Sequence, residues 1–279
     1  MINAKQEIKN LLKKYNLSPK KYMGQNFLIN KNALKKIIEA SDLSCDDTVL
    51  EIGPGLGILT LELTKHAKKI IAIEKDKELA ETLQKIIKEK KINNAEIIYG
   101  DIIEKLKNSE LRINELTNYK IVANIPYYLT SHLIRLLLEL KNKPQLIILM
   151  IQKEVAQRIV ANPPKMTLLS VSVQYYAKPK IVSRIKKDSF WPRPKIDSAI
   201  IKIAPKKEMP SIDSDKFFKI IKAGFSAPRK QLINNLSKGL QIERSKAEQI
   251  LKKSNINPKQ RAESLKIKDW LKILNSINN

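Results

Sequence analysis

The sequence is poor in the residues from which proteins build metal centres and covalent cross-links. Cys45 is the only cysteine, and His66 and His132 are the only histidines among 279 residues. One cysteine excludes an internal disulfide framework and a thiolate metal cluster, and two histidines argue against a metal site built from histidine. We therefore expect a cytoplasmic protein that contains no structural metal.

Long apolar runs are also missing. The longest, Leu146 to Ile151, is far shorter than the ~20 residues that a membrane-spanning helix needs. The first residues, Met-Ile-Asn-Ala-Lys-Gln-Glu, lack the apolar stretch of a signal peptide. No membrane association is expected.

Acidic residues are outnumbered by basic ones, 28 against 53, which gives a net charge of +25 and a pI near 9.9. Such an excess indicates a polyanionic partner, either nucleic acid or an anionic surface. Nucleotide bias in the gene is the alternative explanation, because Lys, Ile and Asn are abundant together. The 43% apolar content is enough for a packed core.

Strand-like and helix-like segments alternate through most of the chain. This alternation predicts an α/β fold with a parallel sheet and helices on both faces. A later run at 196–203 could add a strand, and residues 5–17 have the spacing of a helix. The expected strands are 48–52, 69–74, 96–99, 120–123 and 146–151, and the expected helices between them are 56–65, 76–90, 130–140 and 153–160.

The remaining part of the chain reads as helical only. A linker from Ala204 to Pro210 divides a domain of residues 1–205 from a helical domain of residues 206–279, with helices expected at 216–223, 229–238, 244–253 and 265–276. From residue 206 onward there are 17 basic and 7 acidic residues, a net charge of +10. A solvated lysine face would explain this charge, but its density and the pair Arg229 and Lys230 at an expected helix start favour a polyanion-binding surface.

A glycine turn follows the first expected strand, in the run Glu51-Ile52-Gly53-Pro54-Gly55-Leu56-Gly57. Glycines let a ligand approach the main chain closely. Position 58 is Ile, so the dinucleotide fingerprint is not met, and no Gly-Lys-Ser/Thr follows as in a phosphate loop. Glu74 and Asp101 end or follow the next two strands, where they can accept from ribose hydroxyls and an adenine amino group. The three features together predict a nucleoside site.

Asn124-Ile125-Pro126-Tyr127 follows the strand at 120–123. An amide oxygen and a proline-fixed carbonyl can accept both N–H groups of an adenine N6 amine, and they stabilise the charge that develops during attack on a methyl group. Tyr127 can stack on an extruded base. By itself the stretch is also consistent with an ordinary proline turn, and it leaves DNA, RNA or protein open as substrate.

A second aromatic position lies at Phe190, within the proline-stiffened run from Ser189 to Ser198. Phe190 could form the other side of a base-binding pocket. Ordinary packing is the competing explanation for an aromatic residue close to proline.

With these residues in view, the chain resembles the bacterial small-subunit rRNA adenine dimethyltransferase family over nearly its whole length. The segments that carry the resemblance are 24–28, 51–57, 124–127, 152–155, 190–198, 225–236 and 261–265. One departure is Thr167, in a run where the family usually has glycine, which puts the local loop conformation in question.

The resemblance implies a Rossmann-like methyltransferase fold with a small all-helical C-terminal domain, and S-adenosylmethionine as cofactor. It implies dimethylation of the N6 atoms of two adjacent adenines in a hairpin loop near the 3′ end of small-subunit (16S) rRNA, within a pre-30S particle. The chain would act as a monomer in small-subunit biogenesis. The implied cofactor residues are Asn26, Leu28, Gly53, Gly55, Glu74, Asp101 and Asn124, and the implied target-base residues are Asn124, Pro126, Tyr127 and Phe190.

Three alternatives stay open. The related large-subunit (23S) rRNA adenine N6-methyltransferase of the macrolide-resistance type shares the glycine loop and the Asn-Ile-Pro-Tyr type of motif, but the segment 225–236 favours the small-subunit enzyme. A non-enzymatic ribosome assembly factor would have little use for Glu74, Asp101 and Asn124. A nicotinamide dehydrogenase is disfavoured by the glycine spacing.

Overall fold

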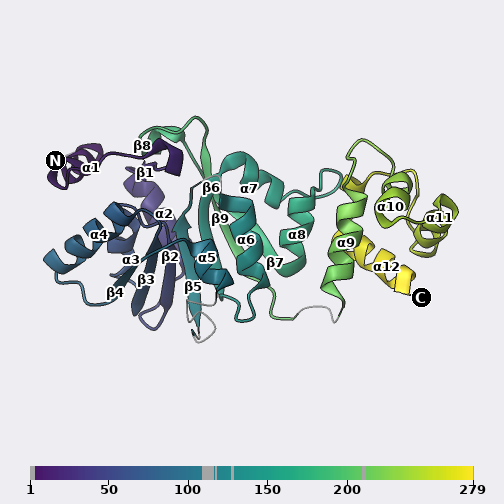
Figure 1. Cartoon of the computed structure of the whole chain (residues 1–279), viewed down its shortest axis with the longest axis horizontal. Helices are drawn as coiled ribbons and strands as arrows, with labels where there is room; N and C mark the ends of the chain where they lie inside the picture. Colours follow the sequence, from purple (N-terminus) through teal and green to yellow (C-terminus); the bar gives the residue numbers. More distant parts are fainter. Residues whose placement is uncertain (1–3, 109–115, 117, 127–128, 209–211, 279) are drawn as a thin grey trace. The chain divides into compact units, whose positions relative to one another are not determined.

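The computed structural model describes residues 4–108, 116, 118–126, 129–208 and 212–278 (Figure 1). The chain forms two compact units, one of residues 1–156 and 179–205 and the other of residues 157–178 and 206–279. The second unit is therefore discontinuous in sequence, because residues 157–178 group with the C-terminal helices. The division into functional domains at residue 205 stays a prediction.

The first unit is built on a mixed sheet, which has seven strands in the described part of the chain. The five predicted strands are present and run parallel to one another, and the strand at the expected run 196–203 runs antiparallel to its neighbour at 146–152. The Rossmann-like fold class is confirmed. In sheet order the strands are β4 (Ala95–Tyr99), β3 (Lys69–Glu74), β2 (Thr48–Ile52), β5 (Tyr119–Asn124), β6 (Leu146–Gln152), β9 (Ser198–Pro205) and β7 (Ala177–Ile185).

Burial explains why the central strands form here. Leu50 of β2 pairs in register with Ile71 on one side and Ile121 on the other, and all three side chains are buried. Strands covered on both faces read as continuous apolar runs. The edge strand β7 alternates exposed and partly buried positions between two buried ends and contains Pro179, which an edge strand tolerates because its outer N–H groups need no partner in the sheet.

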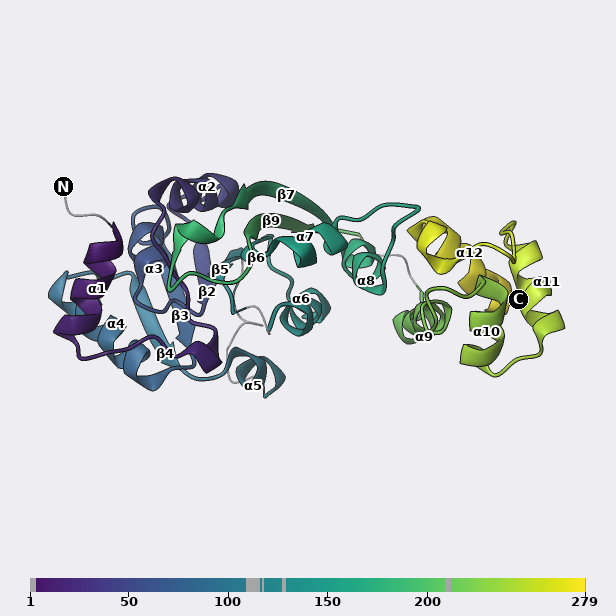
Figure 2. The ribbon, with the colours of Figure 1, turned by 90° about the horizontal axis from the view of Figure 1, so that it is seen from above.

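Helices cover the two faces of this sheet, with α2 and α6 on opposite sides (Figure 2). Helix α2 (Lys31–Ser41) begins at a local sequence signal. Asn30 caps α2 by accepting from the Ala33 N–H at 3.0 Å, which satisfies one of the unpaired amides of the first turn. The helices of this unit are α1 (Ala4–Lys14), α2 (Lys31–Ser41), α3 (Ile58–Leu63), α4 (Lys77–Glu89), α5 (Ile102–Lys107) and α6 (Thr130–Glu139), while α7 (Lys153–Ile159) crosses the boundary between the units at residue 156.

A two-stranded sheet joins distant parts of the first unit. β1 (Phe27–Leu28) pairs antiparallel with β8 (Phe190–Trp191), so that Leu28 lies opposite Phe190. All of Phe27, Leu28 and Phe190 are buried. This pairing fixes the segment that precedes α2 against the segment that precedes β9.

The second unit is helical, with an aromatic core. Tyr175 and Phe217 pack with ring centroids 4.5 Å apart, and Trp270 is fully buried. The offset geometry of such ring pairs adds to the stabilisation from burial alone. Its helices are α8 (Leu168–Tyr176), α9 (Ser214–Gly224), α10 (Leu232–Leu240), α11 (Arg244–Lys253) and α12 (Ile267–Asn278).

Two sequence expectations in this unit are settled by local backbone geometry. The expected helix start at Arg229 was wrong, because Gln231 is extended at ψ 149° and α10 begins at Leu232. Arg229 and Lys230 therefore lie exposed in the preceding turn. Thr167 has an extended backbone at φ −125° and forms a capping box with Ser170 at the start of α8. A glycine is therefore not required at position 167.

Candidate active site

One pocket lies at the carboxyl ends of three neighbouring strands, which is where open α/β sheets bind ligands. Gly53 follows β2, Glu74 ends β3, and Asn124 ends β5, and all three line the pocket. The Gly53 N–H donates to the Ile73 carbonyl at 2.9 Å, which ties the loop to the neighbouring strand. The sheet order, with β2 between β3 and β5, brings these residues together.

The glycine loop has a backbone that only glycine adopts easily. Gly53 and Gly55 have φ values of +68° and +59°, in the left-handed region that disfavours side chains. A Cβ atom on Gly55 would lie 3.2 Å from Cε1 of Phe27, and one on Gly53 would lie 3.8 Å from Cδ of Pro126. The absence of side chains therefore keeps the floor of the pocket open between these two neighbours.

Glu74 is the buried carboxylate of the pocket. Its Oε2 accepts from the Gly55 N–H and its Oε1 from the Asp76 N–H, each at 2.9 Å. Burial raises the pKa of Glu74 above the ordinary value, and the two N–H groups oppose this rise. The carboxylate has lone pairs left over, with which it can accept from further hydroxyl donors.

Glu51 is a second buried carboxylate, one strand away on β2. It lines the pocket and is 1% exposed. Its Oε2 has no hydrogen-bond partner among the described residues. Burial, helped by the nearby charge of Glu74, raises the pKa of Glu51 to about 8. The sequence marked Glu51 only as part of the glycine-loop motif, although an acidic residue inside an apolar strand was itself a signal.

The segment from Met23 to Leu28 forms another wall of the pocket. Asn26 donates from Nδ2 to the Gly24 carbonyl at 2.9 Å. The Asn26 carbonyl in turn accepts from Nδ2 of Asn124 at 3.4 Å. With Nδ2 of Asn124 directed at the main chain, its Oδ1 is the atom of this amide that can accept from a substrate amine.

Phe190 lies where β8 meets this segment, opposite Leu28. It lines the pocket but is only 3% exposed, and it packs in the main apolar core of the unit. Ile125, next to Asn124, is buried as well. The aromatic ring is therefore held rigidly, and the part of it that a ligand can reach faces the pocket.

Of the eleven predicted site residues that the structure describes, eight line this pocket and three lie elsewhere. The eight that line it are Asn26, Leu28, Gly53, Gly55, Glu74, Asn124, Pro126 and Phe190. Tyr127 lies outside the described residues, and Arg229 and Lys230 belong to the second unit. Asp101 does not line the pocket. The roles predicted for all twelve residues stay predictions.

Asp101 stands beside the pocket, where it caps α5. Its Oδ1 accepts from the Ile103 N–H at 2.8 Å, and its Oδ2 pairs with Nζ of Lys75 at 2.7 Å. Burial alone would raise the pKa of Asp101, but Lys75 and the Ile103 N–H outweigh it and lower the pKa. Lys75 itself lines the pocket, so Asp101 borders the site through this ion pair.

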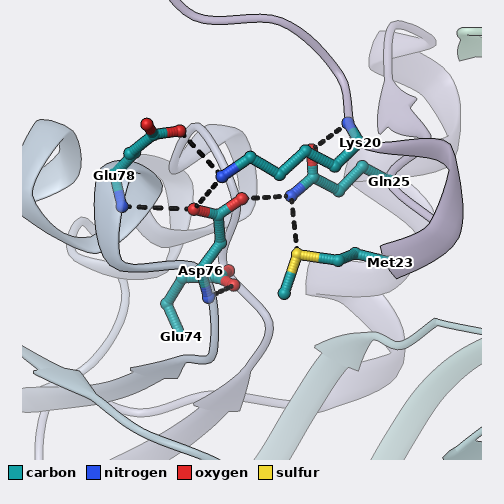
Figure 3. Close-up of polar contacts among 6 residues, drawn as sticks. All are labelled: Lys20, Met23, Gln25, Glu74, Asp76 and Glu78. Atoms are coloured by element: carbon teal, nitrogen blue, oxygen red, sulfur yellow. Dashed lines mark hydrogen bonds and ion pairs between the residues drawn. The ribbon is translucent and has the colours of Figure 1, made fainter.

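A cluster of polar residues around Asp76 was not predicted from the sequence. Asp76 is 3% exposed, and it accepts from Nζ of Lys20 at 2.9 Å and from Nε2 of Gln25 at 2.7 Å (Figure 3). It also caps α4 through the Glu78 N–H at 3.1 Å. Asp76 is the first residue of the expected helix 76–90, and this position gave no sign of its partners, which are far away in sequence.

Neither a metal site nor a membrane span is found in the part of the chain that the structure describes. No group of three or more His, Cys, Asp or Glu side chains within it is placed to hold a metal ion. No helix among the same residues is long and apolar enough to cross a bilayer. Cys45 is exposed and is a free cysteine.

A Rossmann-like sheet is combined here with a pocket floored by glycines, a buried carboxylate at a strand end and an Asn-Ile-Pro turn. These features together indicate a methyltransferase whose methyl donor contains a nucleoside. The family model described as ribosomal RNA adenine dimethylase matches residues 16–279. The chain belongs to this family, and it is therefore an enzyme of the rRNA adenine dimethyltransferase type.

Relatives and solved structures agree with this assignment. The chain is 42% identical over 267 residues to ribosomal RNA small subunit methyltransferase A of Dehalococcoides mccartyi, covering 95% of this chain and 90% of the relative. It is 41% identical over 273 residues to the protein of the same name from Clostridium botulinum, covering 96% and 98%. A dimethyladenosine transferase from Plasmodium falciparum superposes with a TM-score of 0.78 at 28% identity, covering 90% and 97%.

A more distant structure supports the fold alone. The 23S rRNA methyltransferase ErmE superposes with a TM-score of 0.70 at 22% identity, covering 91% of this chain and 100% of that one. The likeness thus extends beyond the sheet to nearly the whole chain.

Proposed function

We propose that this chain uses S-adenosylmethionine to dimethylate the N6 atoms of two adjacent adenines in a hairpin loop near the 3′ end of small-subunit (16S) rRNA. It would do so in the cytoplasm, as a monomer acting on a pre-30S particle during small-subunit biogenesis. The observation that carries the proposal is the single pocket lined by Gly53, Glu74 and Asn124.

The residues present fit the proposed cofactor. Glu74 would accept from the ribose hydroxyls, because its two oxygens are already oriented by the N–H groups of Gly55 and Asp76. The bare backbone at Gly53 leaves room for the methionine part. Glu51 offers a buried Oε2 that has no partner in the described residues, and its carboxyl, protonated at neutral pH, can donate to or accept from a polar group of the ligand. Asp101 would accept from the adenine amino group once its ion pair with Lys75 has opened.

The cofactor supplies a methyl group already activated by its sulfonium, so this chain needs no strong base or nucleophile. Oδ1 of Asn124 and the Ile125 carbonyl would accept the two N–H groups of the target amine, and their dipoles stabilise the charge that develops on nitrogen. Pro126 fixes the main chain at this point. Phe190 would hold the base from one side, and Tyr127 from the other. Orientation and proximity then account for most of the rate.

RNA binding is proposed for the second unit. Arg229 and Lys230 are exposed in the turn before α10, where they can contact phosphates. Residues 206–279 carry a net charge of +10, which favours a polyanion through counterion release. The small-subunit assignment is supported by relatives near 40% identity that are named for that subunit.

The test is methyl transfer from labelled cofactor to isolated small-subunit and large-subunit particles, followed by mass spectrometry of rRNA fragments. We expect dimethyladenosine in one hairpin of the small subunit. Incorporation into large subunits alone would refute the proposed substrate. Failure of the protein to bind S-adenosylmethionine in calorimetry would refute the proposed cofactor.

The Asn124→Ala variant tests the proposed role of the amide. We expect it to lose at least about 100-fold in methyl transfer, the effect typical of removing one preorganised polar group, while it keeps its affinity for RNA. Asn93→Ala is the matched control, because Asn93 is an exposed asparagine between α4 and β4. Equal losses of transfer and RNA affinity in Asn124→Ala would contradict the assigned role.

A further inference from the structure

A stretch of chain at the edge of the pocket has no buried side chain to hold it in place. Residues 18–26, here called the strap, contain no buried residue. Buried residues stand on both sides of it, at Leu12 in α1 and at Phe27 in β1. Four strap residues, Met23, Gly24, Gln25 and Asn26, nevertheless line the pocket. Polar contacts must therefore hold this wall of the pocket in place.

Polar contacts from Lys20 and Gln25 of the strap converge on Asp76 (Figure 3). Nζ of Lys20 lies 2.9 Å from Oδ1 of Asp76 and 2.7 Å from Oε2 of Glu78. Nε2 of Gln25 donates to Oδ2 of Asp76 at 2.7 Å, and Oε1 of Gln25 accepts from the Lys20 N–H at 2.8 Å. Lys20 and Gln25 are thus bonded to the same carboxylate and to each other.

The environment of Asp76 makes this fastening strong. Its side chain is 2% exposed, and that of Lys20 is 27% exposed. Burial raises the pKa of Asp76, but the hydrogen bonds from Lys20 and Gln25 outweigh it, so the pKa is lowered overall. A buried carboxylate that keeps its charge depends on its donors. Opening the strap would leave that charge without Lys20 and Gln25.

Asp76 also contacts the residue proposed to bind ribose. Its N–H donates to Oε1 of Glu74, whose Oε2 accepts from the Gly55 N–H, each at 2.9 Å. Asp76 does not itself line the pocket. Its side chain holds the strap, and its main chain orients Glu74.

We propose that Asp76 is a positioning residue, which closes the strap over the cofactor pocket through Lys20 and Gln25 and at the same time orients Glu74. The inference rests on the proposed use of S-adenosylmethionine, and it adds a device that sets cofactor affinity. Fastening the strap before the cofactor arrives removes an ordering cost from binding. The chemical step itself, at Asn124, does not depend on this fastening.

The experiment measures the S-adenosylmethionine Kd by calorimetry, and kcat at saturating cofactor, for Lys20→Met, Lys20→Arg and wild type. We expect Lys20→Met to weaken cofactor binding about tenfold, equivalent to ~1.4 kcal/mol, with kcat within about twofold because binding rather than chemistry is affected. Lys20→Arg keeps the cation and should restore most of the affinity.

Lys14→Met is the matched control. Lys14 pairs with Oε2 of Glu89 on the same helix α4 at 2.8 Å, but it lies outside the strap and does not line this pocket. Its removal should leave the Kd unchanged. Hydrogen exchange of residues 21–26 without cofactor should accelerate in Lys20→Met and not in Lys14→Met.

Two outcomes would overturn the inference. One is an unchanged Kd in a folded Lys20→Met protein, and the other is a fall in kcat as large as the loss of affinity. Asp76→Asn gives a second check, since asparagine still caps a helix but removes the charge that pairs with Lys20; it should weaken binding at least as much. If wild type fails to bind S-adenosylmethionine, the proposed function fails, whereas normal wild-type binding with no effect of Lys20→Met refutes only the role of Asp76.

Discussion

Replacing Glu51 by glutamine is expected to stabilise the protein at neutral pH, by an amount that shrinks as the pH falls. Glu51 is buried on β2, and burial raises its pKa to about 8 in the folded protein. The ordinary value, which the unfolded chain restores, is 4.5. Between these two values the folded protein keeps a proton that the unfolded chain releases.

The sign follows from proton linkage. Wherever the folded state binds more protons than the unfolded state, the free energy of unfolding falls as the pH rises, by ~1.4 kcal/mol per pH unit for one group. The stability contributed by protonated Glu51 is therefore complete below pH 4.5 and is lost progressively up to the folded pKa. At pH 7 the loss for wild type amounts to about 3 kcal/mol. Glutamine does not titrate, so the variant escapes this loss.

The assay is urea unfolding followed by circular dichroism at pH 5, 6, 7 and 8, with the free energy of unfolding extrapolated to water. The quantity to compare is the difference between Glu51→Gln and wild type at each pH. The new amide contributes a constant offset, because its hydrogen bonding does not depend on pH. Only the slope of this difference against pH reports the titration of Glu51.

Glu81→Gln serves as the control, since Glu81 is on α4 with its side chain 55% exposed, 3.9 Å from Nζ of Lys77. Exposed pairs of this kind contribute under ~1 kcal/mol, so no slope is expected. A difference between Glu51→Gln and wild type that stays constant from pH 5 to pH 8 would refute the reasoning. Glu51 would then be ionised in the folded protein, and its unpartnered Oε2 would have a compensating donor outside the described residues.

Two further predictions concern the second unit. Changing both Arg229 and Lys230 to glutamate should weaken binding to small-subunit rRNA, more strongly at low salt than at high salt because fewer counterions are released; filter binding at two salt concentrations measures this, and unchanged affinity at low salt would remove the turn from the interface. Thr167→Ala should cost about 1 kcal/mol of stability, because it removes the capping box of α8, whereas Thr167→Ser should keep it; equal urea midpoints for the two variants would contradict the capping role.

The central strands were predictable because their environment is uniform. Residues of β2, β3 and β6 are covered on both faces, so their sequences are nearly unbroken apolar runs. The strand β7 was not predicted, because it lies at the sheet edge and alternates exposed polar positions with partly buried ones around Pro179. Helix α2 was missed although Asn30 and the buried positions Ala33, Ile37 and Ala40 carried its signal.

The site was predictable only where a strand end defines it. Gly53, Glu74 and Asn124 follow from the order of strands, since parallel neighbours bring their carboxyl ends to one edge. The pairing of Leu28 with Phe190 was not predictable from local sequence, because β1 and β8 have two residues each and are separated by most of the unit. That pairing places the aromatic ring beside the segment from Met23 to Leu28 that lines the pocket, so a contact between residues far apart in sequence completes the pocket.

Asp76 shows why a local sequence signal can conceal a long-range contact. An aspartate before an amphipathic helix reads as an N-cap, and Asp76 does accept from the Glu78 N–H. One capping bond, however, uses only part of the acceptor capacity of a carboxylate, and a carboxylate that is 3% exposed must fill the remainder from protein donors. Those donors, Lys20 and Gln25, lie 56 and 51 positions earlier. A capping aspartate that is fully buried therefore indicates that another segment of the chain is fastened to it, and here that segment is the wall of the pocket.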